Sequence, residues 1–542
     1  MKRLAHPTPC QGYLAFVLHA HLPYVRHPEH ARFLEEGWLF EALTECYLPL
    51  IEVFAGWQRD GIAARLTLVM SPTLCAMLRD PLLQQRYRDH LNGQVELAEK
   101  ERIRTHLQAA FQPLAVYYRQ RLEAVRSRYD ACRGDVVGVL RRFQEAGLIE
   151  IIPCAATHAV LPLLAGHVPS LRAQIGVARA MHRDCFGGEP RGFWLPECAY
   201  ASEVEAPLRE AGFRWFILDT HGLWYACPRP RYGSWAPIIT PGGLAAFGRD
   251  AASAQQVWSR QAGYPGDPRY RDFYRDIGFD LELDYVRPYF LAAGQRGFTG
   301  IKYYRISGGS GVEKAVYDRP QARAAVAEQV AHFVAARREE WQQRFSHMDR
   351  PPLTVAPYDA ELFGHWWHEG PEFLDGVVRL LAAQSPERRL VTPGDYLRLH
   401  PENQVAAPAA SSWGEGGYCG VWLNPKNGWI QPRLQEAGRQ MSGLVSRFPR
   451  AEGVVDRGLR QAARELLLAQ ASDWPFMLRH DNHAAYARQR VREHLEAFAG
   501  LRRQLLAGQL DEALLVQREQ SWPLFATLDY GGWLEERSTP AS

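Results

Sequence analysis

The segment Tyr13-Leu-Ala-Phe-Val-Leu18 is a short apolar run that ends in His19-Ala-His21. An apolar run of this length, bounded by polar residues, predicts a buried strand. The same form recurs at residues 65–70 before Ser71, 148–152 before Thr157-His158, 192–195 before Glu197, 215–218 before Asp219 and 353–356 before Asp359. Helical patterns follow these runs, which predicts a mostly parallel sheet. Because polar residues gather where strands end, we expect an α/β fold built on a β/α barrel, with the active site at the carboxyl ends of its strands.

The remaining patterns divide the chain into four predicted parts. Residues 1–226 form the first part of the barrel, with a helical insertion at about 80–130. Residues 227–310 are rich in Gly, Pro and aromatic residues, which predicts an inserted, loop-rich segment or a small inserted domain. Residues 311–405 complete the barrel. Residues 406–542 begin with an Ala/Pro/Ser linker and then become helical, which predicts a C-terminal helical domain.

The composition restricts the classes of partner. Lys and Arg number 63 and Asp and Glu 60, so the overall charge does not favour nucleic acid or an anionic membrane, and we expect a neutral substrate. The sequence contains no apolar run of 18 residues, which argues against a membrane span, and the early histidines disfavour a signal peptide. The 9 cysteines form no CxxC pair, so we expect a cytoplasmic protein without a disulfide framework.

Two carboxylates follow predicted strands in aromatic surroundings. Glu197 lies in Gly192-Phe-Trp-Leu-Pro-Glu-Cys-Ala-Tyr200, and Asp359 lies in Val355-Ala-Pro-Tyr-Asp-Ala-Glu-Leu-Phe-Gly-His365. Each carboxylate taken alone is also consistent with a helix cap or an Arg partner. If the barrel brings both acids together, they match retaining glycosyl transfer, which needs two carboxyl groups about 5–5.5 Å apart. The pair therefore indicates a glycosidase-type site.

Three histidines occupy the ends of predicted strands. His19 and His21 are two residues apart, so in an extended segment both side chains point to the same side, into the barrel mouth. On their own they fit a metal site, a structural pair or a substrate contact equally well. His158 is as consistent with a structural role as with lining the same cleft.

Five segments in the right order resemble the five sequence regions of glycoside hydrolase family 57. They are His19-Ala-His-Leu-Pro-Tyr24, Gly147-Leu-Ile-Glu-Ile-Ile152, the segments around Glu197 and Asp359, and Ser412-Trp-Gly-Glu-Gly-Gly-Tyr418. More narrowly, the chain resembles that family's 1,4-α-glucan branching enzymes from near residue 12 to the C-terminal helices. Gln256-Val-Trp-Ser259 and Gly263-Tyr-Pro-Gly-Asp267 belong to this narrower match.

The resemblance implies a distorted (β/α)7 barrel, an inserted domain, a C-terminal helical domain and a retaining mechanism with neither metal nor organic cofactor. Glu197 matches the family's nucleophile, and Asp359 matches its general acid/base. Their environments should separate their pKa values, because Glu197 must be ionised while Asp359 holds a proton. For His19 and His21 the resemblance favours contacts with sugar hydroxyls over metal ligation.

The resemblance also assigns residues that contact the glucan. Arg249 and Gly266 match ligand-contacting positions of the family, and with Trp258 they lie in a segment, 249–267, that would act as a mobile cover. The matching tryptophans of the branching enzymes bind glucan, which applies to Trp413 and Trp422. The alternatives are a solvated charge for Arg249 and core packing for the two tryptophans.

Asp473 lies at the start of a predicted helix, in Ala-Ser-Asp-Trp-Pro-Phe, where an N-cap is the structural alternative. The family match makes it a glucan contact supplied by the helical domain. Together with the other assignments, it places part of the expected glucan site in residues 406–542.

The leading hypothesis is therefore a branching enzyme that cleaves α-1,4 bonds and transfers the chain to a 6-hydroxyl of an α-glucan acceptor. A hydrolytic α-amylase or a 4-α-glucanotransferase is the alternative within the family. A metal-dependent polysaccharide deacetylase with His19 and His21 as ligands is a different class, and a non-catalytic glucan-binding scaffold is a third. We expect no nucleic-acid or membrane partner; the sequence leaves the oligomeric state open, with a monomer as one alternative.

Overall fold

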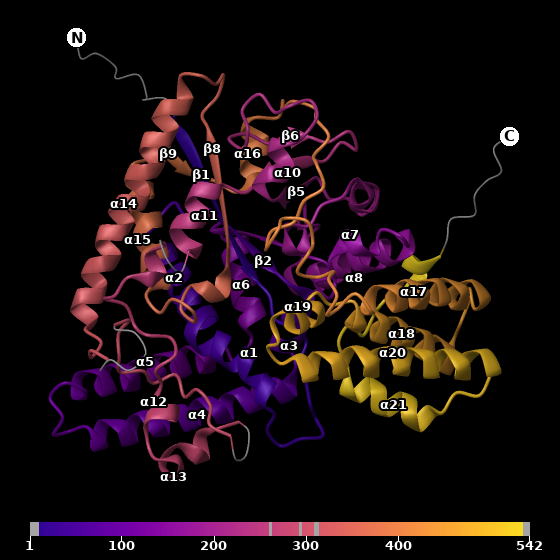
Figure 1. The fold of residues 1–542 in the computed structure, drawn as a ribbon, viewed down its shortest axis with the longest axis horizontal. Coiled ribbons are helices and arrows are strands. Elements are labelled where there is room, and N and C mark those ends of the chain that lie inside the picture. Colours follow the sequence, from indigo (N-terminus) through magenta and orange to yellow (C-terminus); the bar gives the residue numbers. More distant parts are fainter. Residues whose placement is uncertain (1–9, 260–262, 292–294, 308–313, 535–542) are drawn as a thin grey trace.

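The computed structural model describes residues 10–259, 263–291, 295–307 and 314–534, and these form two β-sheets (Figure 1). The strands are β1 (Gly12–Ala20), β2 (Leu66–Met70), β3 (Ile149–Ile152), β4 (Gly192–Trp194), β5 (Trp215–Leu218), β6 (Ile238–Ile239), β7 (Ala245–Gly248), β8 (Leu353–Asp359) and β9 (Arg388–Leu390). The first sheet is parallel throughout, in the order β3-β2-β1-β8, with β9 also paired to β1. The second has the order β4-β5-β7-β6, and in it β6 runs antiparallel to β7.

Backbone hydrogen bonds join the two sheets at both edges. The amide of Trp194 in β4 donates to the carbonyl of Pro153 just after β3, at 3.0 Å. The amide of Asp250 just after β7 donates to the carbonyl of Val355 in β8, at 2.8 Å. The parallel strands therefore follow one another around a ring in the order β3-β2-β1-β8-β7-β5-β4. This confirms the predicted fold class, a distorted (β/α)7 barrel with a C-terminal helical domain.

The interior of the barrel follows from the alternation of side chains along the strands. Tyr13, Ala15 and Val17 of β1 belong to an inner core together with Trp215 and Val355. The intervening residues of β1 belong to the outer core that packs against the helices. Successive side chains of a strand point to opposite faces, so the next residue on the inner face of β1 is His19.

The helices of the first half surround this ring. They are α1 (Gly37–Ala42), α2 (Leu48–Arg59), α3 (Pro72–Leu78), α4 (Pro81–Arg104), α5 (Gln112–Ala131), α6 (Val136–Glu145), α7 (Leu161–Leu164), α8 (Val168–Phe186), α9 (Glu205–Glu210) and α10 (Thr220–Trp224). The long pair α4 and α5 lies below the barrel in Figure 1 and occupies the segment predicted as a helical insertion. Asp80 starts α4 because its carboxylate accepts the amides of Leu82 and Leu83, and Pro81 suits the first turn.

The sequence predicted a loop-rich segment at residues 227–310, but part of this segment forms strands and helices. Its first part contributes β6 and β7 to the second sheet, and α11 (Ala251–Trp258) follows at once. The short helices α12 (Ile277–Asp280) and α13 (Leu283–Val286) lie beside α4 (Figure 1). The barrel resumes with α14 (Arg319–Phe345), α15 (Gly370–Ala382) and α16 (Pro393–Leu399). The predicted domain boundaries and the covering role of this segment stay predictions.

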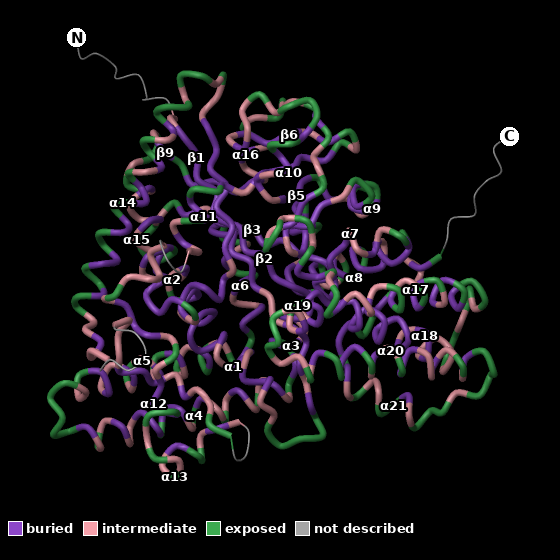
Figure 2. Tube along the Cα trace, viewed as in Figure 1, coloured by how far each residue is buried: buried purple, intermediate pink, exposed green. Residues whose placement is uncertain are grey.

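The C-terminal helices pack beside the barrel. They are α17 (Ile430–Arg447), α18 (Gly453–Ala469), α19 (Asp473–His480), α20 (Ala484–Ala507) and α21 (Glu512–Ser521). Leu459 and Leu466 of α18 belong to the same hydrophobic core as Phe16 of β1. Figure 2 accordingly shows buried residues both along the strands and along α18. The helical region is thus joined to the barrel by a continuous apolar core.

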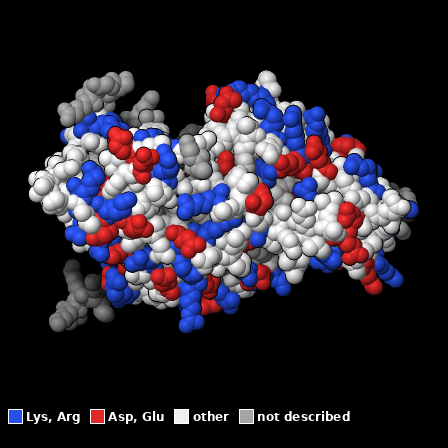
Figure 3. Space-filling model, turned by 90° about the horizontal axis from the view of Figure 1, so that it is seen from below, with Lys and Arg blue, Asp and Glu red and all other residues white. Residues whose placement is uncertain are grey.

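Two features of the structure concern nucleic-acid and membrane partners: the distribution of surface charge and the character of the helices. Basic and acidic side chains lie scattered among neutral ones over the face shown in Figure 3. Within the part of the chain that the structure describes, none of the helices combines the length and the apolar character that crossing a membrane requires.

Candidate active site

His19 lies beside Asp359 because of the register between two parallel strands. β1 and β8 pair so that these two residues are direct neighbours, and Nδ1 of His19 is 3.1 Å from Oδ1 of Asp359. The imidazole stacks on the indole of Trp194, with 4.8 Å between ring centroids. His19 therefore points into the barrel, as predicted, and its partner there is the Asp359 carboxylate.

Glu197 lies in a strained turn immediately after β4. Its backbone is left-handed, at φ 62° and ψ 22°, and Cys198 follows at φ 49°. Such a conformation costs a non-glycine residue about 1–3 kcal/mol and occurs preferentially at functional sites. Trp413 holds the turn, because its backbone amide donates to the Glu197 carbonyl at 2.8 Å and its indole Nε1 donates to Oε2 at 2.6 Å. The strain and the indole contact both point to a positioned carboxylate.

Burial raises the pKa of Glu197 from its usual 4.5 to about 8. The hydrogen bonds from Trp413 and Ser472 lower this pKa, whereas the nearby negative charges of Asp359 and Asp473 raise it further. In the free protein at neutral pH, Glu197 therefore holds a proton, although a nucleophile must be ionised. The proton has to leave Glu197 before this carboxylate can attack a sugar.

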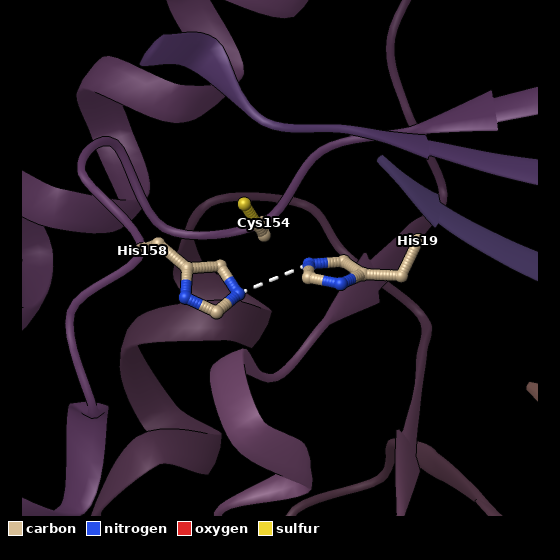
Figure 4. Close-up of side chains that lie close together, drawn as sticks. All are labelled: His19, Cys154 and His158. Carbon is tan, nitrogen blue, oxygen red and sulfur yellow. Dashed lines mark hydrogen bonds between the residues drawn. The ribbon is translucent and has the colours of Figure 1, made fainter. Parts of the chain in front are cut away.

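His158 connects the two carboxyl groups. It has a left-handed backbone, at φ 57°, and its side chain is buried. Its Nε2 lies 3.0 Å from Nε2 of His19, the contact drawn in Figure 4. Its Nδ1 lies 2.7 Å from the hydroxyl of Ser472 and 3.6 Å from Oε1 of Glu197. Glu197 and Asp359 are thus brought to one site through a chain of direct contacts.

Asp473 reaches this site from the C-terminal helices. It is the first residue of α19, and both of its carboxylate oxygens lie 3.2 Å from Nε2 of His21. The His21 ring in turn stacks on His158 at 3.9 Å between centroids. Ser472, not Asp473, occupies the N-cap position of α19. The N-cap alternative for Asp473 is therefore wrong, and its carboxylate is directed to the barrel instead.

Arg249 belongs to the barrel and not to a covering loop. It directly follows β7, and its guanidinium carbon lies 5.5 Å from the centre of the Trp413 ring. Its Nη1 is 3.5 Å from a carboxylate oxygen of Asp219, which follows β5. The side chain is about one-sixth exposed, so it is not the solvated surface charge of the alternative. Arg249 and Trp413 therefore form one wall of the site.

Three predicted glucan contacts have other surroundings. Trp422 is 2 % exposed and packs with Val160, Ala199 and Val421, so core packing accounts for it and its indole presents no open face to a sugar. Trp258 ends α11 and packs against the main core. Gly266 lies in the short turn Tyr264–Gly266, which the Tyr264 hydroxyl ties to His332 of α14 at 2.7 Å. Sugar contacts by Trp258 and Gly266 stay predictions.

The sequence reasoning missed several residues of the site. Ser472 was overlooked because a serine before a helix is an ordinary cap. Trp194 stands near Glu197, and Asp219 was singled out by the strand-end pattern, but neither was assigned a role in the site. Glu361, two residues after Asp359, accepts hydrogen bonds from the Tyr47 hydroxyl and the His21 amide, and burial raises its pKa to about 8. The sequence signal that could have identified Glu361 is the presence of a second acid two residues from Asp359.

Within the described residues, His19, Cys154 and His158 offer three potential metal-binding atoms that lie within 4.8 Å of one another (Figure 4). The two imidazoles already use their facing Nε2 atoms in a mutual hydrogen bond, and their Nδ1 atoms contact Asp359 and Ser472. We therefore assign these nitrogens to hydrogen bonding. What the site presents for chemistry is two carboxyl groups, an indole donor and a buried imidazole pair, which suits acid–base and nucleophilic steps.

Two family models and several relatives match this chain. The model described as "Glycosyl hydrolase family 57" matches residues 15–408, and the model for the C-terminal part of 1,4-alpha-glucan branching enzymes matches residues 433–533. A probable 1,4-alpha-glucan branching enzyme of Mycobacterium tuberculosis is 32 % identical over 95 % of both chains.

Two solved structures are similar over nearly their whole length. An α-amylase from Thermotoga maritima is 39 % identical with a TM-score of 0.91, and the match covers 97 % of this chain and 99 % of that one. A branching enzyme from Thermococcus kodakaraensis is 30 % identical with a TM-score of 0.87, and 97 % of each chain is covered. The family match spans more than half of the chain and includes the strands, both carboxylates and the histidines of the site, so the chain belongs to glycosyl hydrolase family 57.

Proposed function

We propose that this protein is a 1,4-α-glucan branching enzyme, a transferase that cleaves α-1,4 bonds and forms α-1,6 branches. The observation that carries the proposal is the entry of the C-terminal helices into a two-carboxylate barrel site. The region that matches the branching-enzyme C-terminal model begins at residue 433 and includes Asp473, whose carboxylate contacts His21. The curated relatives from Mycobacterium and Thermococcus, described as branching enzymes, support the same activity.

The proposed reaction has two displacement steps. In the first, Asp359 gives a proton to the glycosidic oxygen while ionised Glu197 attacks the anomeric carbon, so the leaving glucan departs with the proton and a glycosyl-enzyme forms. In the second, ionised Asp359 takes the proton of an acceptor 6-hydroxyl, whose oxygen displaces Glu197 from the anomeric carbon. The product retains the α configuration, because each displacement inverts it.

The glucan would be bound by the polar and aromatic groups around the two acids. Trp413 is suited to stack on a sugar ring, because its indole is held in place by Glu197 and Arg249. Arg249, His21 and Asp473 offer donors and acceptors for sugar hydroxyls. We propose an α-1,4-glucan as both donor and acceptor.

Hydrolysis is the second candidate function, because the Thermotoga relative with 39 % identity is described as an α-amylase. The two activities share the first step and differ in the acceptor, which is water in hydrolysis and a 6-hydroxyl in branching. Incubation with amylose, followed by enzymatic debranching, counts both products in one sample. Branching predicts more new α-1,6 linkages than new reducing ends, whereas reducing ends without α-1,6 linkages would identify a hydrolase.

A further inference from the structure

A chain of polar contacts connects the two carboxyl groups of the site. Asp359 Oδ1 contacts His19 Nδ1 at 3.1 Å, His19 Nε2 contacts His158 Nε2 at 3.0 Å, and His158 Nδ1 contacts the Ser472 hydroxyl at 2.7 Å. The Ser472 hydroxyl also lies close enough to Glu197 to lower the pKa of that carboxyl by hydrogen bonding, and His158 Nδ1 is 3.6 Å from Glu197 Oε1. Figure 4 shows the central contact, in which the two imidazoles meet through their nitrogen atoms. The three middle members are each at most 3 % exposed, so water has little access to the chain.

The chain can run in two directions. Burial lowers the pKa of both His19 and His158, so both imidazoles are neutral and each has one donor nitrogen and one acceptor nitrogen. A serine hydroxyl likewise donates one hydrogen and accepts others. Each middle member therefore accepts from one neighbour and donates to the other, and reversing one member reverses them all.

In the first arrangement the proton is on Glu197. Glu197 donates to the Ser472 oxygen, Ser472 donates to His158 Nδ1, His158 Nε2–H donates to His19, and His19 Nδ1–H donates to ionised Asp359. Moving one proton along each contact gives the second arrangement, with Asp359 protonated and Glu197 ionised. No proton is gained or lost between the two. The second arrangement is the form that the first displacement step requires.

We propose that Ser472, His158 and His19 form a proton relay that shares one proton between Glu197 and Asp359 and so couples their ionisation. The inference rests on the proposed roles of these two acids in glycosyl transfer. It resolves the conflict between the protonated Glu197 of the free protein and the ionised nucleophile of the reaction. Ser472 and His158 are positioning residues, because they act through His19 and the two carboxyl groups.

The chain opposes loss of the shared proton. If Glu197 and Asp359 are both ionised, Ser472 donates to Glu197 and His19 donates to Asp359. One contact between them, such as that of Ser472 Oγ with His158 Nδ1, is then left without a hydrogen. A substitution that interrupts the chain removes this cost of double ionisation. The atoms next to the substituted residue then lack a hydrogen-bond partner whether one or both carboxyl groups are ionised. The doubly ionised form should then become populated at lower pH.

Other ionisable groups surround the relay and contribute to its field. They include His21 after β1, Tyr47 before α2, Cys154 after β3, Cys198 after β4, Arg249 after β7, Glu361 after β8, Cys419 beside Trp422 and Asp473 on α19. The Ser472 and His158 variants below leave all of these groups unchanged, and the Cys154→Ala control changes only Cys154.

Two donor substrates separate the ionisation of Glu197 from the protonation of Asp359. Cleavage of amylose needs both ionised Glu197 and protonated Asp359, whereas a maltooligosyl fluoride needs mainly ionised Glu197, since fluoride leaves without a proton. The ratio of kcat/KM for the fluoride to kcat/KM for amylose therefore rises when the doubly ionised form appears. Both rates are measured as total bond cleavage from pH 6 to 10, regardless of the acceptor.

In Ser472→Ala we expect the ratio to begin its rise about one pH unit lower than in the wild type, and to be about tenfold higher in that pH range. The reason is that a buried contact without its hydrogen no longer disfavours the doubly ionised form relative to the form that holds one proton. His158→Asn should behave alike, since Asn tolerates the left-handed backbone and lacks the nitrogen that faces His19. Ser472→Thr keeps the hydroxyl and should restore the wild-type ratio. Cys154→Ala, a buried neighbour outside the chain, is the matched control and should leave the ratio unchanged.

An unchanged ratio profile in both Ser472→Ala and His158→Asn would overturn the relay, even if both variants lose activity, because a structural defect slows both substrates alike. If Ser472 only donated a hydrogen bond to Glu197, its loss would lower kcat/KM for both substrates equally and would leave the ratio unchanged. Failure of the proposed function is a different result: cleavage of both substrates with no new α-1,6 linkages.

Discussion

Replacing Glu197 by Gln should stabilise the protein increasingly as the pH rises. The pKa of Glu197 is raised from 4.5 to about 8 by burial, so the folded protein holds a proton there that the unfolded chain releases above pH 4.5. The stability that Glu197 contributes is therefore fully present below pH 4.5 and is lost progressively as the pH rises through 8. Gln has nearly the same shape, accepts the Trp413 indole hydrogen and does not ionise.

The size of the effect follows from the same pKa. The interval from 4.5 to about 8 spans about three and a half pH units, and each unit corresponds to about 1.4 kcal/mol. Glu197→Gln should thus gain on the order of 3–5 kcal/mol relative to the wild type at pH 8.5 and little at pH 4.5. The difference in melting temperature between the two proteins, measured across this range, reports the gain.

Glu361→Gln is the matched comparison, because burial also raises the pKa of Glu361 to about 8. It should show the same dependence on pH. The account of Glu197 as a buried carboxyl that holds a proton would be refuted by either of two results. One is a difference in melting temperature between Glu197→Gln and the wild type that does not change with pH, and the other is a higher melting temperature for the wild type at alkaline pH.

Further predictions concern activity. Glu197→Gln and Asp359→Asn should each abolish turnover on amylose while the circular dichroism spectrum stays native, and near-normal turnover in either folded variant would remove that residue from the mechanism. Trp413→Phe should lower kcat/KM about tenfold at neutral pH and move the ionisation of Glu197 to higher pH, because the indole donor to its carboxylate is lost; a pH–rate profile checks the direction. Dialysis against a chelator should leave activity unchanged, and activity that is lost and then restored by zinc would revive a role for His19, Cys154 and His158 as metal ligands.

Much of the barrel could be predicted because its signals are local. Apolar runs that end in polar residues marked β1, β2, β3, β4, β5 and β8, and the two-residue period of β1 placed His19 on the inner face. β7 was missed because Ala245-Ala-Phe-Gly248 is short, carries no β-branched residue and lies in a stretch rich in Gly and Pro. The segment 227–310 was consequently predicted to be an inserted, loop-rich cover of the active site.

The site was predictable where a residue type has a recognisable place in a motif. Asp359 is the last residue of β8 and Glu197 lies in the turn after β4, so the topology of a parallel barrel brings them to one end. The link between them depends on contacts between residues far apart in the sequence, such as His158 with Ser472, and no local pattern encodes that pairing. The burial of Trp422 likewise depends on how its loop packs on Val160, which the Gly-rich sequence around it does not reveal.

The measurement that tests the proposed function most directly is the product analysis on amylose. The purified protein is incubated with amylose, and one half of the sample is treated with a debranching enzyme before reducing ends are counted in both halves. We expect the increase on debranching, which equals the α-1,6 linkages formed, to exceed the reducing ends released without debranching. Release of reducing ends with no increase on debranching would contradict the proposal and identify the protein as a hydrolase.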